Sequence, residues 1–418
     1  MPDTRATRRV VVTGLGCVTP VGNDVPTFWQ SLLAGRSGIR RISTFDPSDL
    51  DVQIAAEVRE FDPASRMDGK LARRTDRFTQ FAIAACDEAL RDAGLDLTKE
   101  DRDRVGVIIG SGMGGVQTWE QQHEQFLQKG PRRVSPLLIP MMIPDMASGQ
   151  IAINYGLRGP NYDTTSACAS GAHATGVAFR HIRAGDADIM ITGGSEAATT
   201  KFTVAAFANM GALSKRNSEP EKASRPFDRD RDGFVIAEGC GIYVLEELEH
   251  ARRRNARIYC ELAGYGATAD GYHITAPDPE GKGAAGCMRL AIAEAGLAPS
   301  EIDYVNAHGT STPLNDATEV KAIIELFGEH ASRLIINSTK SMIGHGLGAA
   351  GAMEFVAMVL SVYHQQVHCT LNHENPDNGV TLDFVKGTAR KAEIRAAISN
   401  SFGFGGHNCC LCVTAHKD

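Results

Sequence analysis

The same order of strand, turn and helix segments occurs twice along this chain of 418 residues, and this repetition constrains its fold most strongly. The first half has expected strands at 10–14, 105–109, 162–165 and 187–192, and expected helices at 75–93 and 169–182. The second half has expected strands at 258–265, 302–306, 334–338, 396–401 and 409–413, and expected helices at 284–295, 316–327 and 346–360. Strands that alternate with helices are typical of α/β proteins. We therefore expect two related α/β halves, residues 1–255 and 256–418, which divide near the highly charged segment 249–257.

Helix 169–182 consists mainly of small residues and is interrupted by Gly171 and Gly176. A helix with so few large side chains is packed closely on several sides, because a long side chain would leave it no room. We therefore expect this helix to lie near the centre of the protein.

Composition and charge exclude several classes of function. A net charge of −7 argues against a protein that binds nucleic acid. The ten cysteines include no two C-x-x-C motifs that could pair around a metal ion, and Cys409, Cys410 and Cys412 follow one another too closely on a strand to converge on one zinc ion. No apolar run approaches about 20 residues, so no transmembrane helix is expected. Because no signal peptide is recognisable, we expect free thiols and a cytoplasmic location.

Cys168 is the first candidate for chemistry. It follows strand 162–165 and opens helix 169–182. At such a position, backbone N–H groups and the helix dipole favour the thiolate and are expected to lower its pKa. The alternative is a small buried thiol without a chemical role, and position alone does not separate the two.

Three residues in two loops favour the interpretation of Cys168 as a nucleophile. His308 follows strand 302–306 among turn-forming residues, and loops at strand ends often carry chemistry. Lys340 and His345 lie five residues apart in a Gly- and Ser-rich segment after strand 334–338. Taken singly, His308 could simply cap its loop and Lys340 could be an ordinary surface ammonium. One cysteine, two histidines and a lysine at strand-to-loop junctions together predict a thiol enzyme.

Phenylalanine and glycine alternate in the segment 402–406, which predicts a mobile turn with aromatic side chains. One interpretation is a gate over a pocket, whose backbone N–H groups reach a reacting oxygen. The alternative is a pair of hydrophobic plugs in a C-terminal turn.

These segments together resemble the β-ketoacyl-acyl-carrier-protein synthase family, most closely its type II, or long-chain, branch. The resemblance covers nearly the whole chain and also includes the motifs at 10–16, 224–228, 231–234 and 403–406. It implies a thiolase-like fold, in which two related α/β halves form a layered αβαβα arrangement, and a homodimer. It also implies an acyltransferase that elongates fatty acids by decarboxylative Claisen condensation.

The resemblance implies roles for individual residues. Cys168 matches the nucleophile that holds the acyl group as a thioester. His308 and His345 match the pair that stabilises the decarboxylating malonyl unit, and Lys340 matches the lysine that supports them electrostatically. Phe404 matches the gating phenylalanine, whose backbone N–H joins that of Cys168 in the oxyanion hole. The matches to the supporting network are Asp316, Glu319 and Glu354.

The implied partner is an acyl carrier protein, which is strongly acidic in this family, so local basic groups must bind it. The matching basic positions are Lys70, Arg73, Arg74, Arg132 and Arg133. The alternative for these residues is a solvated surface. No metal and no organic cofactor are implied, because the phosphopantetheine arm arrives on the carrier. A second loop near the pocket mouth is expected at 268–275.

Two positions depart from the family pattern. Ile343 stands where type II members often have threonine, and His407 stands where threonine usually follows the glycine pair. His407 would place a titrating group near the gate.

Two other functions fit the same motifs. The ketosynthase α subunit of a bacterial aromatic polyketide system shares the fold, nucleophile and histidines, but pairs with a different chain-length-factor subunit. A non-catalytic scaffold or chain-length factor lacks the nucleophile, so Cys168 argues against it. The two histidines and the lysine also disfavour the thiolase and type III synthase relatives.

Overall fold

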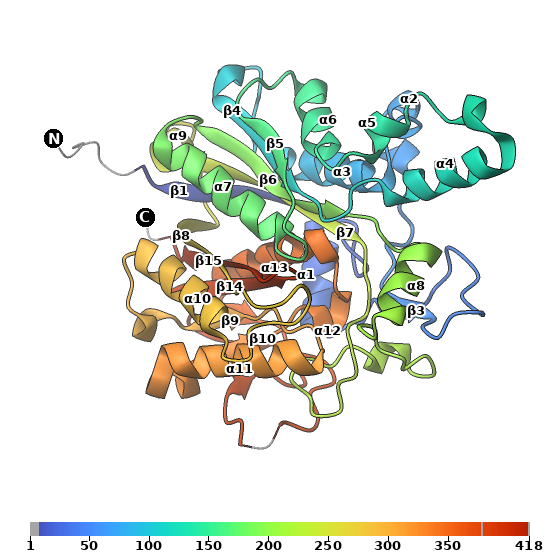
Figure 1. The fold of residues 1–418 in the computed structure, drawn as a ribbon. Helices are drawn as coiled ribbons and strands as arrows, with labels where there is room; N and C mark the ends of the chain where they lie inside the picture. The colour runs from blue at the N-terminus through green and yellow to red at the C-terminus, as the bar shows by residue number, and fades with distance from the viewer. Residues whose placement is uncertain (1–7, 378, 417–418) are drawn as a thin grey trace.

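The computed structural model describes residues 8–377 and 379–416, and its centre is an eleven-stranded sheet with helices on both faces (Figure 1). In spatial order the strands are β12 (Asp383–Phe384), β10 (Ile335–Asn337), β9 (Tyr304–Asn306), β14 (Ala396–Gly403), β15 (His407–Thr414), β8 (Cys260–Ala269), β1 (Val10–Val18), β7 (Gly239–Glu247), β6 (Ile189–Glu196), β4 (Val105–Gly110) and β5 (Asn161–Thr164). Two short ladders pair β2 (Arg40–Arg41) with β3 (Ile54–Ala55) and β11 (Gln366–Val367) with β13 (Arg390–Lys391).

The sheet contains two five-strand units of one design, which meet where β1 pairs antiparallel with β8, and the short strand β12 is added beside β10. In each unit the first strand pairs antiparallel with the last, as β1 does with β7 and β8 with β15. On its other side the last strand pairs antiparallel with the strand that precedes it in the chain, as β7 does with β6 and β15 with β14. Parallel pairs complete both units, in the orders β6-β4-β5 and β14-β9-β10. The duplicated segment order of the sequence therefore corresponds to a duplicated sheet topology.

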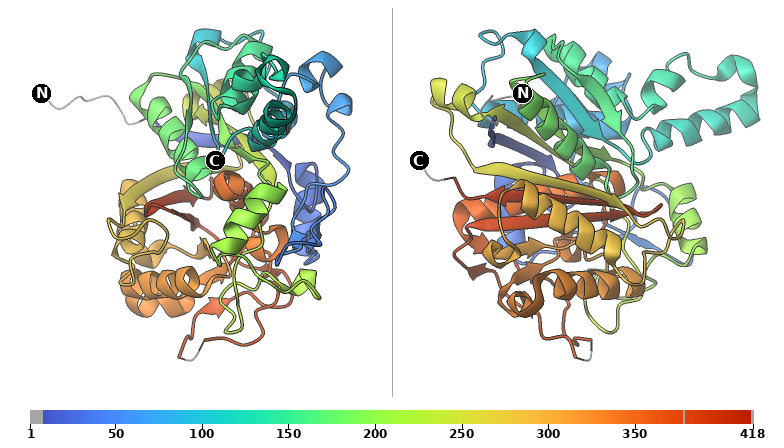
Figure 2. Two further views of the ribbon diagram at one scale, coloured as in Figure 1. Left: turned by 45° about the vertical axis from the view of Figure 1, so that its right-hand side comes forward. Right: turned by 60° about the vertical axis from the view of Figure 1, so that its left-hand side comes forward.

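Helices form three layers around these two units (Figures 1 and 2). Between the units lie α7 (Ser170–Ala184) and α13 (Ala350–His364). On the outer faces lie α3 (Arg77–Asp92) and α6 (Met146–Tyr155) against the first unit, and α10 (Lys282–Glu294) and α11 (Pro313–Phe327) on the side of the second. The predicted αβαβα arrangement of two related α/β halves is confirmed. The remaining helices are α1 (Val25–Leu33), α2 (Gly69–Ala72), α4 (Val116–Lys129), α5 (Leu138–Met142), α8 (Lys201–Asn209), α9 (Leu248–Arg253) and α12 (Lys340–Ile343).

Close packing explains why α7 is built of small residues. A Cβ atom added to Gly176 would lie 2.2 Å from the ring of Tyr265, and one added to Gly171 would lie 3.0 Å from the Cβ of Ala352 on α13. Larger side chains at these positions would force the helices and sheets apart. The predicted central position of this helix is confirmed.

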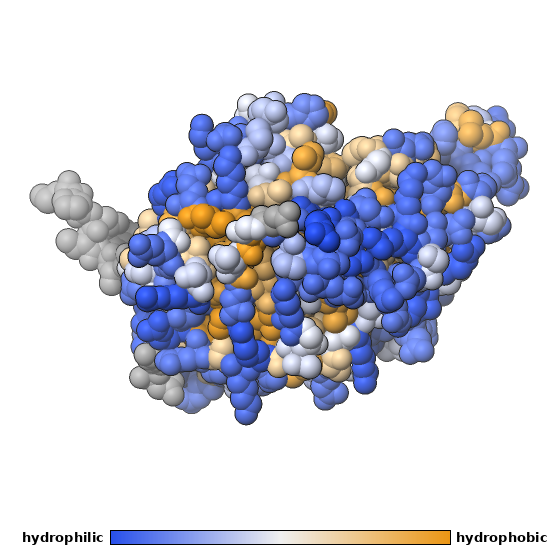
Figure 3. All heavy atoms as spheres, turned by 90° about the horizontal axis from the view of Figure 1, so that it is seen from below, coloured by the Kyte–Doolittle hydropathy of each residue, from blue (hydrophilic) through white to orange (hydrophobic). Residues whose placement is uncertain are grey.

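One segment of the described chain, Leu347–His364, is long and apolar enough to cross a membrane by length and composition alone. In the fold, 89% of this segment is buried. Its apolar side chains therefore pack against protein, as a core helix requires. The face of the molecule seen from below is mostly hydrophilic, with apolar residues visible between the polar ones (Figure 3).

A charge cluster ties α9 to the first unit of the sheet. His250 contacts Glu246 through Nδ1 at 2.8 Å and Glu100 through Nε2 at 3.0 Å, and Arg254 also pairs with Glu246. The hydrogen bond to Glu246, reinforced by Glu100, raises the pKa of His250. A raised folded-state pKa stabilises the fold fully below the unfolded value of about 6.5, and this stabilisation is lost as the pH rises through the folded-state value.

We therefore expect His250→Gln to lower the free energy of unfolding more at pH 6 than at pH 9, measured by urea denaturation. His330→Gln is the control, because His330 contacts a backbone carbonyl through Nε2 at 2.8 Å rather than a carboxylate. Equal losses at the two pH values in His250→Gln would contradict this prediction.

Candidate active site

The turn between β5 and α7 presents Cys168 to a cavity. Ala167, directly before it, has a φ of 50°, which is the left-handed region that a non-glycine residue adopts only under constraint. The constraint comes from short-range hydrogen bonds, in which Ala169 N–H donates to the Ser166 carbonyl at 3.1 Å and Ser170 Oγ donates to the Ala167 carbonyl at 2.7 Å. This tight turn exposes only 8% of Cys168, at the wall of the cavity.

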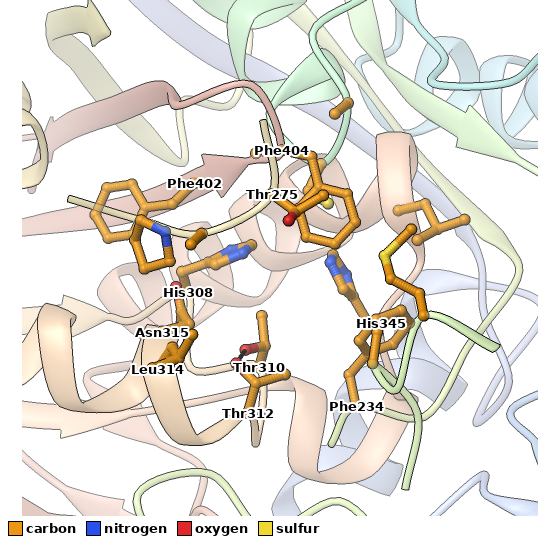
Figure 4. A pocket seen from close by; sticks show the side chains of 18 of the residues that line it. Phe234, Thr275, His308, Thr310, Thr312, Leu314, Asn315, His345, Phe402 and Phe404 are labelled. Atoms are coloured by element: carbon orange, nitrogen blue, oxygen red, sulfur yellow. Dashed lines mark hydrogen bonds between the residues drawn. The ribbon is translucent and has the colours of Figure 1, made fainter. Parts of the chain in front are cut away.

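The cavity has a volume of about 500 Å³ and is lined mainly by apolar side chains (Figure 4). Its lining includes Met113, Cys168, Phe207, Met210, Phe234, Thr310, Thr312, Leu314, His308, His345, Leu347, Phe402 and Phe404. A pocket of this size and polarity suits a small or medium-sized apolar ligand with one reactive polar end.

Burial controls the acidity of the Cys168 thiol. It raises the pKa of Cys168 to about 11, although the ammonium of Lys340 and the backbone N–H of Phe404 act in the opposite direction. Helix α7 begins only at Ser170, two residues after Cys168. The expectation of a lowered pKa for this thiol was wrong, and the physical reason is desolvation of the thiolate.

The rate at which iodoacetamide alkylates Cys168 should therefore rise about tenfold per pH unit between pH 7 and pH 9, because only the thiolate reacts. Peptide mass spectrometry can follow this residue, with Cys168→Ser as the blank. A rate that is already constant at pH 8 would mean a pKa near neutrality and would contradict the effect of burial.

His308 and His345 reach the cavity from the second unit. His308 follows β9 and His345 follows α12, and β9 and β10 are parallel neighbours, so the loops at their carboxyl ends meet. The two imidazole rings lie 5.4 Å apart, nearly perpendicular, and both point into the cavity beneath Phe404 (Figure 4). Burial, and then the charge of Lys340, lowers the pKa of both rings well below the usual value. Both histidines are therefore neutral at pH 7.

Lys340 fixes the tautomer of His308. Its Nζ donates to the His308 carbonyl at 2.7 Å and lies 3.3 Å from His308 Nδ1. An ammonium has only protons to offer, so Nδ1 must accept and Nε2 must carry the ring proton. Glu354 on α13 pairs with the same Nζ, and burial raises the pKa of Glu354 to about 7. The arrangement leaves a neutral N–H donor on His308.

Two buried carboxylates shape the loop that carries His308. Glu319 accepts from the backbone N–H groups of His308 and Gly309, both at 2.8 Å. Asp316 accepts from the backbone N–H of Ser311 at 3.2 Å. Gly309 and Ser311 have φ values of 36° and 69°, so this part of the loop needs such support. The three carboxylates do not line the cavity but support the residues that do, and they are Asp316, Glu319 and Glu354.

The turn with Phe404 covers Cys168. The backbone N–H of Phe404 is directed at the sulfur and lowers its pKa, which is the geometry expected of an oxyanion donor. Gly405 N–H donates to the Ile274 carbonyl at 2.7 Å, so the turn rests on the loop after β8. The predicted second loop at 268–275 therefore lies at the pocket mouth, in contact with this turn.

The two departures from the family pattern lie in different surroundings. Ile343 is fully buried in the hydrophobic core. His407 is exposed and lies over the Phe404 turn, where a Cβ added to Gly405 would be 2.9 Å from its Nε2.

The five basic residues predicted to bind a partner do not line the cavity. They are exposed, on or just after α2 and on the 3-10 turn that follows α4, and comprise Lys70, Arg73, Arg74, Arg132 and Arg133. Within residues 8–377 and 379–416, none of them forms a salt bridge with a carboxylate. Their charges are therefore available to an external anion.

Glu196, at the end of β6, is a site residue that sequence reasoning missed. It is fully buried, and burial raises its pKa to about 7. Its carboxylate accepts from the backbone N–H groups of Gly112 at 2.7 Å, Met113 at 3.2 Å and Gly348 at 3.0 Å. It thus joins both units of the protein behind the cavity. The only signal in the sequence was an acidic residue four positions after the expected strand 187–192.

Among the described residues, no group of three or more His, Cys, Asp and Glu side chains is arranged to hold a metal ion. All ten cysteines are buried and free, so no disulfide links them. Among the groups that line the cavity are the Cys168 thiol, the two neutral imidazoles of His308 and His345, and backbone N–H groups. Such a set can accept an acyl group and stabilise developing negative charge on oxygen.

The comparisons with known proteins cover both units of the sheet. Two family models match, the N-terminal domain of β-ketoacyl synthase over residues 7–251 and its C-terminal domain over residues 259–374. The chain is 52% identical over 401 residues to 3-oxoacyl-[acyl-carrier-protein] synthase 2 of Coxiella burnetii, covering 96% of this chain and 97% of that one. A β-ketoacyl synthase structure from Burkholderia phymatum superimposes with a TM-score of 0.91 at 35% identity, covering 98% of this chain and all of that one. A type II polyketide ketosynthase, solved in complex with its acyl-carrier protein, superimposes with a TM-score of 0.92 at 35% identity, covering 99% of this chain and all of that one.

Proposed function

The chain belongs to the β-ketoacyl synthase family, and from this premise we propose that it condenses a malonyl unit with an acyl group held as a thioester on Cys168. It is a condensing enzyme of the acyltransferase class, which elongates fatty acids. The observation that carries the assignment of residues is the convergence of Cys168, His308 and His345 on one cavity of about 500 Å³.

Sequence identity favours fatty acids over polyketides. The relatives named 3-oxoacyl-[acyl-carrier-protein] synthase 2 are 50–52% identical to this chain, whereas the polyketide ketosynthase is 35% identical. The mainly apolar lining of the cavity also suits a saturated acyl chain, which offers no polar group for a side chain to bind.

The first half-reaction loads the enzyme. Cys168 sulfur attacks the thioester carbonyl of the acyl-carrier protein, the new S–acyl bond forms, and the carrier leaves as a free thiol after it takes up the proton that Cys168 lost. The backbone N–H groups of Cys168 and Phe404 stabilise the oxyanion of the tetrahedral intermediate. Lys340 supports the attack because its charge favours the thiolate.

The second half-reaction forms the carbon–carbon bond. Malonyl-carrier protein loses CO2, and the electron pair of the broken bond passes into an enolate. His308 and His345, both neutral, donate N–H groups to the enolate oxygen, and Lys340 keeps the donor proton of His308 on Nε2. The carbanion carbon attacks the acyl carbonyl on Cys168. Collapse of the intermediate releases the Cys168 thiolate and a β-ketoacyl-carrier protein.

The carrier protein is the partner that these steps require, and its phosphopantetheine arm supplies the thiol that carries both substrates. In one structural relative the ketosynthase is held in complex with its acyl-carrier protein. The exposed, unpaired cations of α2 and of the turn after α4 are the proposed contacts. No metal or organic cofactor enters any step, and we propose a cytoplasmic location.

A homodimer is part of the same proposal. Strand β5 is the last strand of the described sheet, and an edge strand can pair with another chain. Large apolar side chains are also exposed on α4 and on β5, namely Trp119, Phe126, Leu127 and Tyr162. A second copy of the chain would cover both features. Sedimentation velocity should therefore give about twice the 44.8 kDa chain mass.

The function is tested with acyl-carrier proteins that carry saturated chains of graded length, together with malonyl-carrier protein. Intact-protein mass spectrometry follows acylation of the enzyme and formation of the β-ketoacyl product. Acylation and elongation by the homodimer support the proposal, and the accepted lengths describe its pocket. Acylation without elongation would favour a polyketide subunit that needs a different partner. A protein that accepts no acyl group from any carrier is not the proposed enzyme.

A further inference from the structure

His173 lies behind the nucleophile turn and has no place in the steps above. It is on α7, five residues after Cys168, and is only partly buried. Its Nδ1 lies 2.6 Å from Ser166 Oγ, and its ring is edge-on to Tyr265 at 6.2 Å. The backbone of Asn408, on β15, hydrogen-bonds to the same ring. One side chain thus contacts three separate elements of the fold.

The two hydrogen bonds require one tautomer. The contact with Asn408 raises the pKa of His173, so the backbone carbonyl accepts from the ring through Nε2–H. Burial, the largest effect, and the nearby His407 lower this pKa, so the ring is neutral. A neutral ring that donates through Nε2 must accept at Nδ1, and Ser166 Oγ–H is therefore the donor. The bridge has a defined direction, from Ser166 through His173 to Asn408.

This bridge joins the turn that carries Cys168 to the hairpin that carries Phe404. Ser166 begins the turn, in which Ala167 is held in the left-handed region. Asn408 pairs directly with Phe402 in the β14–β15 hairpin. The two structures already touch, because a Cβ added to Gly403 would lie 2.7 Å from the Ser166 carbonyl oxygen. His173 contacts both of them.

We propose that His173 is a positioning residue, which holds the Cys168 turn against the β14–β15 hairpin so that the sulfur and the Phe404 N–H stay aligned for acyl transfer. The inference rests on the proposed role of Cys168 as nucleophile. It assigns His173 to the acylation half-reaction alone, because His308 and His345 are held by different loops. Small displacements of reacting groups cost large factors in rate, so the expected effect is measurable.

The experiment compares His173→Ala, which removes both hydrogen bonds, with His173→Gln, whose amide can donate to Asn408 and accept from Ser166. Ser166→Ala removes only one of the two bonds. His330→Ala is the matched control, because His330 is also partly buried and contacts a backbone carbonyl, but lies in the 3-10 turn Gly328–Arg333. Each variant is assayed for acylation of Cys168, for its alkylation by iodoacetamide across pH 7–9, for CO2 release from malonyl-carrier protein, and for thermal stability.

In His173→Ala, kcat for acylation of Cys168 is expected to fall about tenfold or more. The pH profile of Cys168 alkylation should shift to higher pH. Its CO2 release should stay within about twofold of wild type, and His173→Gln should recover most of the acylation rate. The proposal is overturned if folded His173→Ala acylates like wild type, or if CO2 release falls equally. The proposal is also overturned if His330→Ala loses as much of the acylation rate, since the loss would then follow from replacing any partly buried histidine. If wild type itself is never acylated, it is the proposed function that fails.

Discussion

Replacing Cys168 with alanine is expected to abolish acyl transfer from the carrier protein, and with it chain elongation, by about 10⁴-fold or more. Alanine cannot form a thioester, and the described residues that line the cavity include no second thiol. The side chain lies at the wall of the cavity, so its loss removes little packing and the thermal midpoint should change little. Intact mass before and after incubation with acyl-carrier protein measures acylation directly.

The same variant should keep part of its chemistry. CO2 release from malonyl-carrier protein should persist in Cys168→Ala, because His308 and His345 come from the other unit of the sheet. Cys240→Ala is the matched control, since Cys240 is a fully buried core thiol on β7 that does not line the cavity. It should lose stability but acylate normally. Acylation of Cys168→Ala at the wild-type rate would mean that the nucleophile is a different residue.

The repeated segment order was sufficient to predict two related α/β halves, and both units do use the same strand pairings, whereas the layered αβαβα arrangement was implied by the family resemblance. Strand β7 was missed, although it is central, because Gly239 and Gly241 interrupt its apolar run. Gly241 has to be glycine, since a Cβ there would lie 2.6 Å from the Ala352 carbonyl oxygen on α13. Helix α4 was missed for a different reason, because Gln, His and Glu dominate it and only Thr118 in it is buried. Contacts with distant parts of the chain determine both elements, β7 and α4, and the local sequence pattern carries no information about those contacts.

The active site also shows what a local sequence pattern can and cannot predict. The residue types and their places at strand ends were enough to select Cys168, His308, Lys340 and His345. Their environment was not predictable, because burial raises the pKa of Cys168 where the helix position suggested the opposite. Acidity depends on which groups surround a side chain in space, such as Glu196 from another strand, and these are distant in sequence. Sequence therefore identified the chemical groups, and the structure corrected their protonation.

The Lys340–Glu354 pair is expected to produce the second large effect. Lys340→Met leaves the Glu354 carboxylate buried without its partner, which should cost about 3–5 kcal/mol in the free energy of unfolding. It also removes the donor at His308 Nδ1, so that imidazole can switch tautomer and lose its N–H toward the enolate. Elongation should fall about 10²–10⁴-fold. Alkylation of Cys168 at pH 8 should also slow, because the ammonium no longer lowers the thiol pKa.

A second substitution separates stability from chemistry. In Lys340→Met/Glu354→Gln the buried carboxylate becomes a neutral amide of the same shape, so much of the lost stability should return. Activity should not return, because His308 still lacks its ammonium partner. Glu354→Gln alone is the control, since Lys340 keeps its 2.7 Å bond to the His308 carbonyl, and it should retain more activity than either Lys340 variant. Urea denaturation gives the stabilities, and malonyl-carrier protein decarboxylation reports on the histidines alone. If the double variant regained both stability and elongation, Lys340 would serve the fold only, and the tautomer of His308 would have to be held by another group.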